Sequence, residues 1–202
     1  MNQEVAKDLL RIKAVQINTL SFFTWSSGLK SPIYCDNRLT MSYPNIRQKI
    51  TNTFREMIYA LPEEPDVIAG CATAGIPYAA WIANILHLPM IYVRSKHKLH
   101  GKENQIEGVI ERGQRVIVIE DLISTGASSI QVARALREQG ANVSHVLAIF
   151  TYNLPQMKQN FKKAHLTYQT ITTYEDILDI LENENQLHQA DKQALRLWRH
   201  TF

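Results

Sequence analysis

The chain has 202 residues, of which 45% are hydrophobic and 20% are charged, proportions that suit one globular domain of α/β size. A formal net charge of +3 is too small to indicate nucleic-acid binding, and Cys35 and Cys71 alone do not form a disulfide framework. The most apolar stretch, residues 78–93, is interrupted by polar residues and a proline, so it does not predict a membrane span. No signal peptide is recognisable either, and we expect a cytoplasmic protein.

The amino-terminal part predicts a helix followed by extended pieces. Residues 1–40 begin with an amphipathic pattern and continue with the aromatic segments FFTW and SPIY. A second helix is expected over Tyr43–Ala60, with Pro44 in its first turn, where proline is favoured.

From residue 66 to residue 150, short apolar runs alternate with helical patterns. The predicted strands are Asp66–Gly70, Pro89–Val93, Arg115–Ile119 and Val143–Phe150, and the predicted helices are Ile76–Leu86 and Ala127–Gln139, the latter ended by Gly140. This alternation predicts a parallel sheet covered by helices on both faces. Residues 95–108 are rich in Lys, His and Gly and predict an exposed, mobile loop, and residues 173–202 predict one or two polar helices.

The segment VIVIEDLISTGASS, residues 116–129, combines two kinds of ligand-binding chemistry. Glu120 and Asp121 follow an apolar run, and carboxylates accept hydrogen bonds from sugar hydroxyls or hold magnesium through water. Residues 124–128 form a turn into a helix, whose N–H groups and dipole attract phosphate. The segment therefore fits a ribose 5-phosphate, although an ordinary strand end with a helix cap is the alternative. A P-loop is excluded because GxxxxGK[ST] is missing.

Two other segments offer anion-binding chemistry. Residues 94–101, RSKHKLHG, carry cations that could stabilise a negatively charged ligand, but a solvated basic loop is also compatible with them. His97 and His100 lack a third metal ligand nearby, which argues against a metal site. Residues 70–75, GCATAG, could bring backbone N–H groups to an anion or form a plain strand-to-helix turn.

These segments resemble a known enzyme family. VIVIEDLISTGASS is similar to the phosphoribosyl diphosphate (PRPP) motif of type I phosphoribosyltransferases, and FFTWSSGLKSPIYCDNR, GCATAGIPYAA and YVRSKHKLHGKENQIEG resemble orotate phosphoribosyltransferases in the same order. The resemblance implies an α/β type I phosphoribosyltransferase fold with a central parallel sheet flanked by helices. It also implies a single domain over residues 1–202, with a small hood within residues 1–40 and a flexible catalytic loop at residues 94–108. The implied reaction joins orotate to PRPP, giving orotidine 5′-monophosphate and pyrophosphate.

The resemblance also assigns roles to residues. The implied catalytic residues are Arg94, Lys98 and His100, with Lys98 and His100 reaching the partner's site in a homodimer. The implied PRPP-binding residues are Arg94, Lys98, His100, Glu120, Asp121, Leu122, Ile123, Ser124, Thr125, Gly126, Ala127 and Ser128. Ser124 and Lys30 are the implied orotate contacts. Mg²⁺ would arrive with PRPP and be held by Glu120 and Asp121 through water.

The chain departs from some members of the family at four positions. Ser26, Ala74 and Ser95 stand where some orotate phosphoribosyltransferases have lysine, and Tyr152 stands where they have an orotate-contacting arginine. Two rival functions follow from the fold: a purine phosphoribosyltransferase, which the hood sequence GLKSPIY disfavours, and a PRPP-sensing regulator that binds nucleic acid. The net charge of +3 disfavours the regulator.

Overall fold

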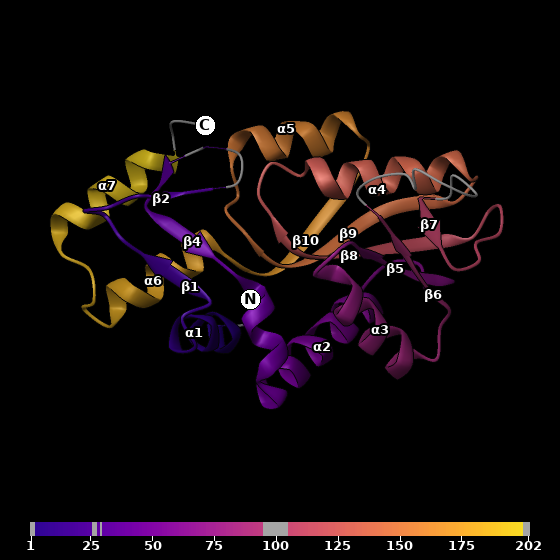
Figure 1. The fold of residues 1–202 in the computed structure, drawn as a ribbon, viewed down its shortest axis with the longest axis horizontal. Helices are drawn as coiled ribbons and strands as arrows, with labels where there is room; N and C mark the ends of the chain where they lie inside the picture. Colours follow the sequence, from indigo (N-terminus) through magenta and orange to yellow (C-terminus); the bar gives the residue numbers. More distant parts are fainter. Residues whose placement is uncertain (1–2, 26–27, 29, 95–104, 200–202) are drawn as a thin grey trace.

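The computed structural model describes residues 3–25, 28, 30–94 and 105–199 (Figure 1). Its centre is a six-stranded sheet with the strand order β10-β9-β8-β5-β6-β7. The strands are β5 (Val67–Cys71), β6 (Met90–Val93), β7 (Ile106–Glu107), β8 (Arg115–Ile123), β9 (Asn142–Thr151) and β10 (Thr167–Thr173). Neighbouring strands are parallel except β6 and β7, so the predicted parallel sheet has one antiparallel edge strand.

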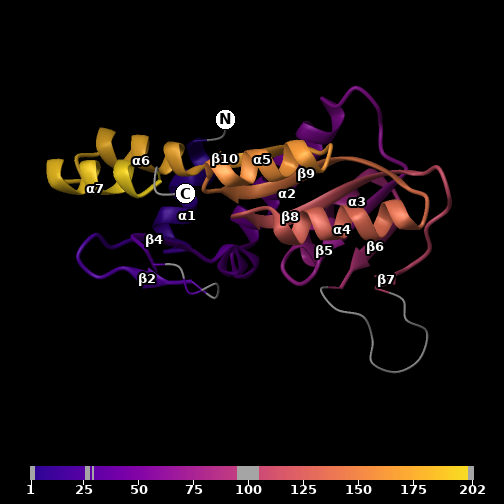
Figure 2. The same ribbon diagram turned by 90° about the horizontal axis from the view of Figure 1, so that it is seen from above.

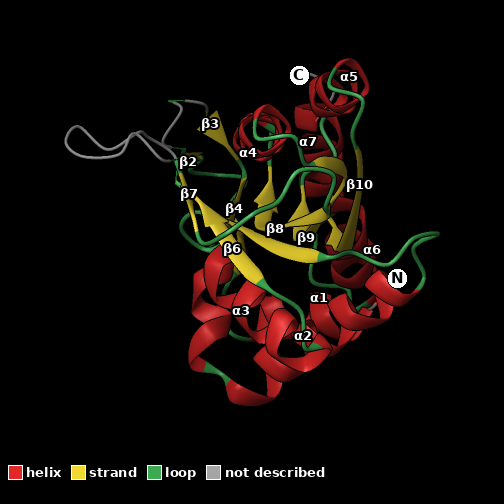
Figure 3. Ribbon diagram, turned by 90° about the vertical axis from the view of Figure 1, so that its right-hand side faces the viewer, coloured by secondary structure: helices red, strands yellow, loops and turns green. Residues whose placement is uncertain are grey.

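Helices cover both faces of this sheet, which confirms the predicted α/β architecture (Figure 3). On one face lie α1 (Gln3–Arg11), α2 (Pro44–Tyr59) and α3 (Gly75–Leu86), and on the other lie α4 (Ala127–Glu138) and α5 (Pro155–Lys163). The chain ends with α6 (Tyr174–Asn183) and α7 (Gln189–Arg199). None of the helices in the described part of the chain has the length and apolar character needed to cross a membrane.

The sequence explains why these segments form these elements. In α2, Pro44 occupies the first turn, and the buried residues Ile46, Ile50, Phe54 and Ile58 recur every fourth position, so one stripe of the helix faces the core. Every residue of β5 is buried, as expected for a central strand with helices on both sides.

A hood projects from one end of the sheet (Figure 2). It contains two antiparallel pairs, β1 (Val15–Ile17) with β4 (Ile33–Cys35) and β2 (Phe23–Thr24) with β3 (Lys30–Ser31), followed by the 3-10 helix η1 (Asn37–Ser42). The hood is not built from the amino terminus alone, because α6 and α7 lie beside these strands (Figures 1 and 2). Helix α1 instead packs into the core, where its Val5 and Leu9 are fully buried.

Several predicted boundaries were wrong. The strand expected to end at Ile119 continues to Ile123, because β9 keeps pairing with it as far as Thr151. The loop predicted over residues 94–108 is partly strand, since Ile106–Glu107 pair with β6. Helix α5 and strand β10 were not predicted, because each buries few side chains and β10 carries a polar, threonine-rich sequence.

Candidate active site

A cavity of about 600 Å³ opens where the carboxyl ends of β5 and β8 meet the hood. Its described lining residues are Thr24, Trp25, Tyr34, Cys35, Asp36, Arg38, Ala72, Thr73, Ala74, Glu120, Asp121, Leu122, Ser124, Ser128 and Tyr152. The chain leaves β5 through α3 toward β6, and it leaves β8 through α4 toward β9 on the opposite side. The cavity therefore lies at a topological switch point, where open α/β sheets bind their ligands.

Two acids form the floor of the cavity. Glu120 is only 5% exposed, and its carboxylate accepts hydrogen bonds from the Asp121 N–H at 3.1 Å, the Ser128 hydroxyl at 3.0 Å and the Ser129 hydroxyl at 3.4 Å. Burial and the negative charge of Asp121 raise the pKa of Glu120 to about 8. Burial also raises the pKa of Asp121. The pair therefore carries less than two full negative charges at neutral pH.

The turn between β8 and α4 has the geometry of an anion site. Gly126 adopts a φ of +80°, and a Cβ atom there would lie 2.5 Å from Phe161 Cε2, so glycine is required. Asn160 fixes the turn by donating a hydrogen bond from Nδ2 to the Thr125 carbonyl at 3.0 Å. Helix α4 starts at Ala127, and Gly126 has no side chain to cap it, so its first-turn N–H groups remain available to a phosphate.

The loop of residues 72–74 forms a second wall. It connects β5 to α3, and the peptide bond between Ala72 and Thr73 is cis. A Cβ atom at Gly75 would lie 2.3 Å from the Ile119 carbonyl oxygen. Glycine at this position therefore lets the start of α3 approach β8 closely, which brings the loop next to the two acids.

The hood side of the cavity is aromatic. The ring of Trp25 lies over Tyr152 with centroids 4.5 Å apart, and its Nε1 donates to the Ile33 carbonyl at 3.1 Å. Trp198 of α7 packs edge-on against Trp25, with centroids 5.8 Å apart. Tyr34 lines the same side. A planar, uncharged ring face suits this part of the cavity.

The structure brings most of the predicted site residues together. Glu120, Asp121, Leu122, Ser124 and Ser128 line the cavity, and Thr125, Gly126 and Ala127 form the adjoining turn. The Ile123 side chain is buried in the core, so it cannot contact PRPP. The Ile123 carbonyl accepts a hydrogen bond from the Thr151 hydroxyl.

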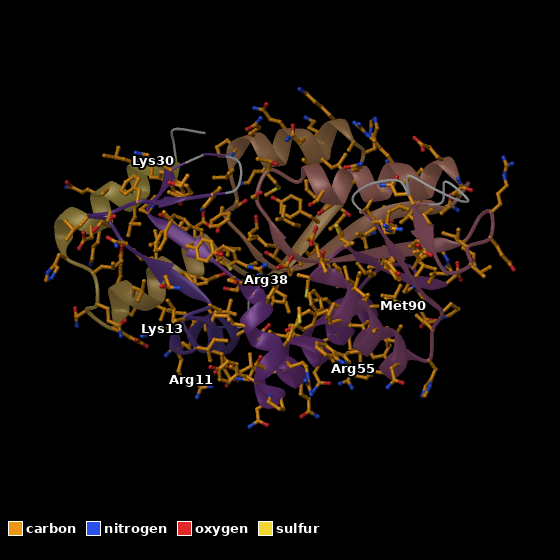
Figure 4. All side chains as sticks on the ribbon, viewed as in Figure 1. Arg11, Lys13, Lys30, Arg38, Arg55 and Met90 are labelled. Atoms are coloured by element: carbon orange, nitrogen blue, oxygen red, sulfur yellow. The ribbon has the colours of Figure 1, made fainter. Side chains whose placement is uncertain are left out.

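Lys30 and Arg94 are not among the described residues that line the cavity. Lys30 is exposed on β3, where its carbonyl accepts a hydrogen bond from Trp198 Nε1 at 3.1 Å (Figure 4). Arg94 follows β6 and pairs with Glu107 at 3.5 Å. Lys98 and His100 lie outside the described residues.

The structure describes two of the four positions at which the chain departs from some family members. Ala74 and Tyr152 line the cavity, whereas Ser26 and Ser95 lie outside the described part of the chain. Tyr152 is 2% exposed and closed in by Trp25 and Trp198.

Sequence reasoning missed the segment that follows β4. Asp36 and Arg38 line the cavity, and the buried Asn37 reaches β8. The available signal was their position: three polar residues, DNR, directly after the apolar strand pattern SPIYC.

The chain is similar to known proteins over its whole length. The phosphoribosyl transferase domain family matches residues 41–184. An orotate phosphoribosyltransferase of Oceanobacillus iheyensis is 53% identical over 202 residues, covering 100% of both chains, and one of Listeria monocytogenes is 50% identical over 199 residues, covering 98% of this chain and 95% of that protein.

The fold is also similar to those of solved structures. The orotate phosphoribosyltransferase of Aeropyrum pernix superposes with a TM-score of 0.76 at 28% identity, covering 88% of this chain and 98% of that chain. UMP synthase of Leishmania donovani superposes with a TM-score of 0.83 at 26% identity, and the match covers 99% of this chain but 42% of that protein. By its sequence, its fold and the cavity at the switch point, the chain belongs to the orotate phosphoribosyltransferases of the type I phosphoribosyltransferase family.

Proposed function

We propose that the chain transfers the ribose 5-phosphate of PRPP to orotate within the cavity at the ends of β5 and β8. The products would be orotidine 5′-monophosphate and pyrophosphate, in the synthesis of UMP. One observation carries this proposal: the turn at the start of α4, two acids and an aromatic hood face the same cavity of about 600 Å³. A ligand with a phosphate, sugar hydroxyls and a planar ring matches these three walls in turn.

PRPP would lie along the sheet side of the cavity. The N–H groups of residues 124–128 would hold the 5-phosphate, and Asp121 and Glu120 would accept hydrogen bonds from the ribose hydroxyls. Glu120 already accepts hydrogen bonds from the Ser128 and Ser129 hydroxyls, so it is oriented for this role. The loop of residues 72–74 would then face the pyrophosphate.

The residues present are compatible with Mg²⁺ that arrives on PRPP. Glu120 and Asp121 supply hard oxygen ligands, which Mg²⁺ prefers. The described residues contain no cluster of three or more side chains able to hold a metal ion, so the remaining ligands would be PRPP oxygens and water. When bound, Mg²⁺ would neutralise charge on the pyrophosphate as it leaves.

The charges of the cavity indicate that further cations are needed. Its described lining contains the acids Asp36, Glu120 and Asp121 and one cation, Arg38, which cannot balance the phosphates of PRPP. We therefore propose that Arg94, Lys98 and His100 supply the missing positive charge, the last two from the partner subunit of a homodimer. Cations aimed at a leaving pyrophosphate stabilise the transition state as the anomeric C–O bond breaks.

The chemistry itself would depend on positioning. The orotate ring, held against the hood, would direct a ring nitrogen at the anomeric carbon while the acids and the turn hold the ribose. No covalent intermediate on the protein is required.

An absorbance assay tests the function. Purified protein, PRPP and Mg²⁺ are mixed with orotate, uracil, adenine or hypoxanthine in separate reactions. Turnover of orotate with little turnover of the other bases is expected, whereas a preference for a purine base, or no turnover of any base, would refute the proposal.

A further inference from the structure

Arg38 holds an unusual position in the cavity. Among the described residues that line it, Arg38 alone carries a positive charge, and its side chain is 64% exposed. It follows β4, on the same side of the cavity as Tyr34 and Trp25. Figure 4 places it near the middle of the molecule, whereas Lys30 lies at the outer part of the hood.

Asp36 holds the guanidinium of Arg38 in place. Arg38 Nε donates to Asp36 Oδ1 at 2.7 Å and Nη2 donates to Oδ2 at 2.8 Å, which is a bidentate pair. The Arg38 backbone N–H also donates to Asp36 Oδ1, at 3.1 Å, so the carboxylate is fixed at the start of η1. The pKa of Asp36 is lowered chiefly by its hydrogen bond with Arg38, so the pair is charged at neutral pH.

The paired guanidinium can still bind a second anion. A guanidinium has five N–H groups, of which Asp36 takes two, and the other three can serve a planar carboxylate. Strand β4 carries Tyr34 just before Arg38 in the chain, and the neighbouring Asn37 donates to the Asp121 carbonyl, so Arg38 lies where the aromatic hood meets the strand that carries the acids. We propose that Arg38, held by Asp36, pairs with the carboxylate of the pyrimidine substrate and so selects a carboxylated ring. This inference rests on the proposed function.

The alternative anion for Arg38 is a phosphate of PRPP. The turn of residues 124–128 and the loop of residues 72–74, which are suited to phosphate and pyrophosphate, belong to the sheet side of the cavity. Arg38 belongs to the hood side, in the segment that directly follows β4 and its Tyr34. Position therefore favours the carboxylate.

Steady-state kinetics of Arg38→Ala test the proposal, with KM measured for orotate at saturating PRPP and for PRPP at saturating orotate. Loss of a charge-assisted pair predicts that KM for orotate rises about 10- to 100-fold while KM for PRPP changes less than about threefold. Methyl orotate, which lacks the negative charge, is added as a competitive inhibitor. The wild type should bind methyl orotate much more weakly than orotate. Arg38→Ala should bind the two compounds with nearly equal affinity.

Two further variants separate the possible outcomes. Arg38→Lys should recover part of the orotate affinity, because lysine keeps the charge but not the planar fork. Arg55→Ala is the matched control, since Arg55 also pairs with a neighbouring acid, Glu56, but is not among the residues that line the cavity. This variant should behave as the wild type does. An unchanged KM for orotate, or a rise confined to PRPP, would overturn the assignment of Arg38. A wild-type protein that turns over no base would instead refute the proposed function.

Discussion

Asn37 of η1 donates a hydrogen bond from Nδ2 to the backbone carbonyl of Asp121 at 2.6 Å, across 84 positions of sequence. Strand β5 pairs with β8 only as far as Ile119, so the Asp121 carbonyl lies beyond the last residue that β5 can serve. Asn37 is 1% exposed, and its Oδ1 accepts a hydrogen bond from the Cys35 thiol at 3.3 Å. This buried amide therefore joins the hood to the strand that carries the two acids.

Replacing Asn37 with alanine should weaken both stability and PRPP binding. The buried Asp121 carbonyl would lose its partner, so we expect the free energy of unfolding to fall by about 1–3 kcal/mol in denaturant titrations. The KM for PRPP should rise because Asp121 is less firmly held. Asn142→Ala is the control, since Asn142 also donates to a carbonyl, that of Gly113, but at an exposed site. Equal losses in the two variants would contradict the role of Asn37.

Gly126→Ala should damage the turn that we propose to bind the 5-phosphate. The substitution meets both an unfavourable φ of +80° and a contact with Phe161 at 2.5 Å. We expect destabilisation by more than 1 kcal/mol and a large rise in KM for PRPP. Gly113→Ala provides the comparison, because Gly113 has a similar φ of +89° but open space around it, so it isolates the backbone strain. If both variants bind PRPP as the wild type does, the turn does not hold the 5-phosphate.

The acids of the cavity should make stability depend on pH. The folded pKa of Glu120, about 8, lies above its ordinary value of 4.5, so the folded protein retains a proton that the unfolded chain releases. The free energy of unfolding contributed by this group is therefore full below pH 4.5 and is lost as the pH rises through about 8. Thermal unfolding of Glu120→Gln should show a shallower fall over this range. Glu138→Gln, an exposed change on α4, should keep the wild-type pH dependence.

Trp198 should matter for orotate more than for PRPP. It binds α7 to the hood through its hydrogen bond to Lys30 and its edge-on contacts with Trp25 and Tyr152. Trp198→Phe keeps an aromatic ring but loses the N–H donor, so we expect a loss of about 1 kcal/mol in stability and a rise of several-fold in KM for orotate. Leu197→Ala, at a 67% exposed position of the same helix, should leave both quantities unchanged. A larger effect on KM for PRPP would place Trp198 in a different role.

The loop cations should govern turnover. Lys98→Ala should lower kcat by tens-fold or more, equivalent to roughly 2 kcal/mol, by analogy with the loss of one donor to a transition-state anion. Unfolding curves should match those of the wild type, and unchanged turnover would exclude a catalytic role for Lys98.

Mixed dimers test the proposed homodimer with shared active sites. Subunits with Lys98→Ala are combined with subunits carrying Asp121→Asn, which should weaken PRPP binding. One site in each heterodimer would then hold both native residues, so part of the activity should return. Purified heterodimers without any recovery would show that each subunit uses its own Lys98.

The sequence by itself determined the sheet, the helices on both faces and, through the resemblance of residues 116–129 to the PRPP motif, the enzyme family. These features depend on local patterns: apolar runs of strand length, an amphipathic period in helices, and glycine where the backbone must turn. The elements it failed to predict, α5 and β10, bury few side chains, so their sequences lack a clear apolar pattern.

Tertiary structure decided what completes the cavity. It brings Arg38 and Asn37 from the amino-terminal hood to acids more than 80 positions later, and it places Trp198 from the last helix against Trp25. No local pattern encodes such pairings, because they depend on how distant segments pack once the sheet has formed. The sequence therefore determined the segments that could bind a ligand, and the packing of the hood against the sheet decided which side chains line the cavity.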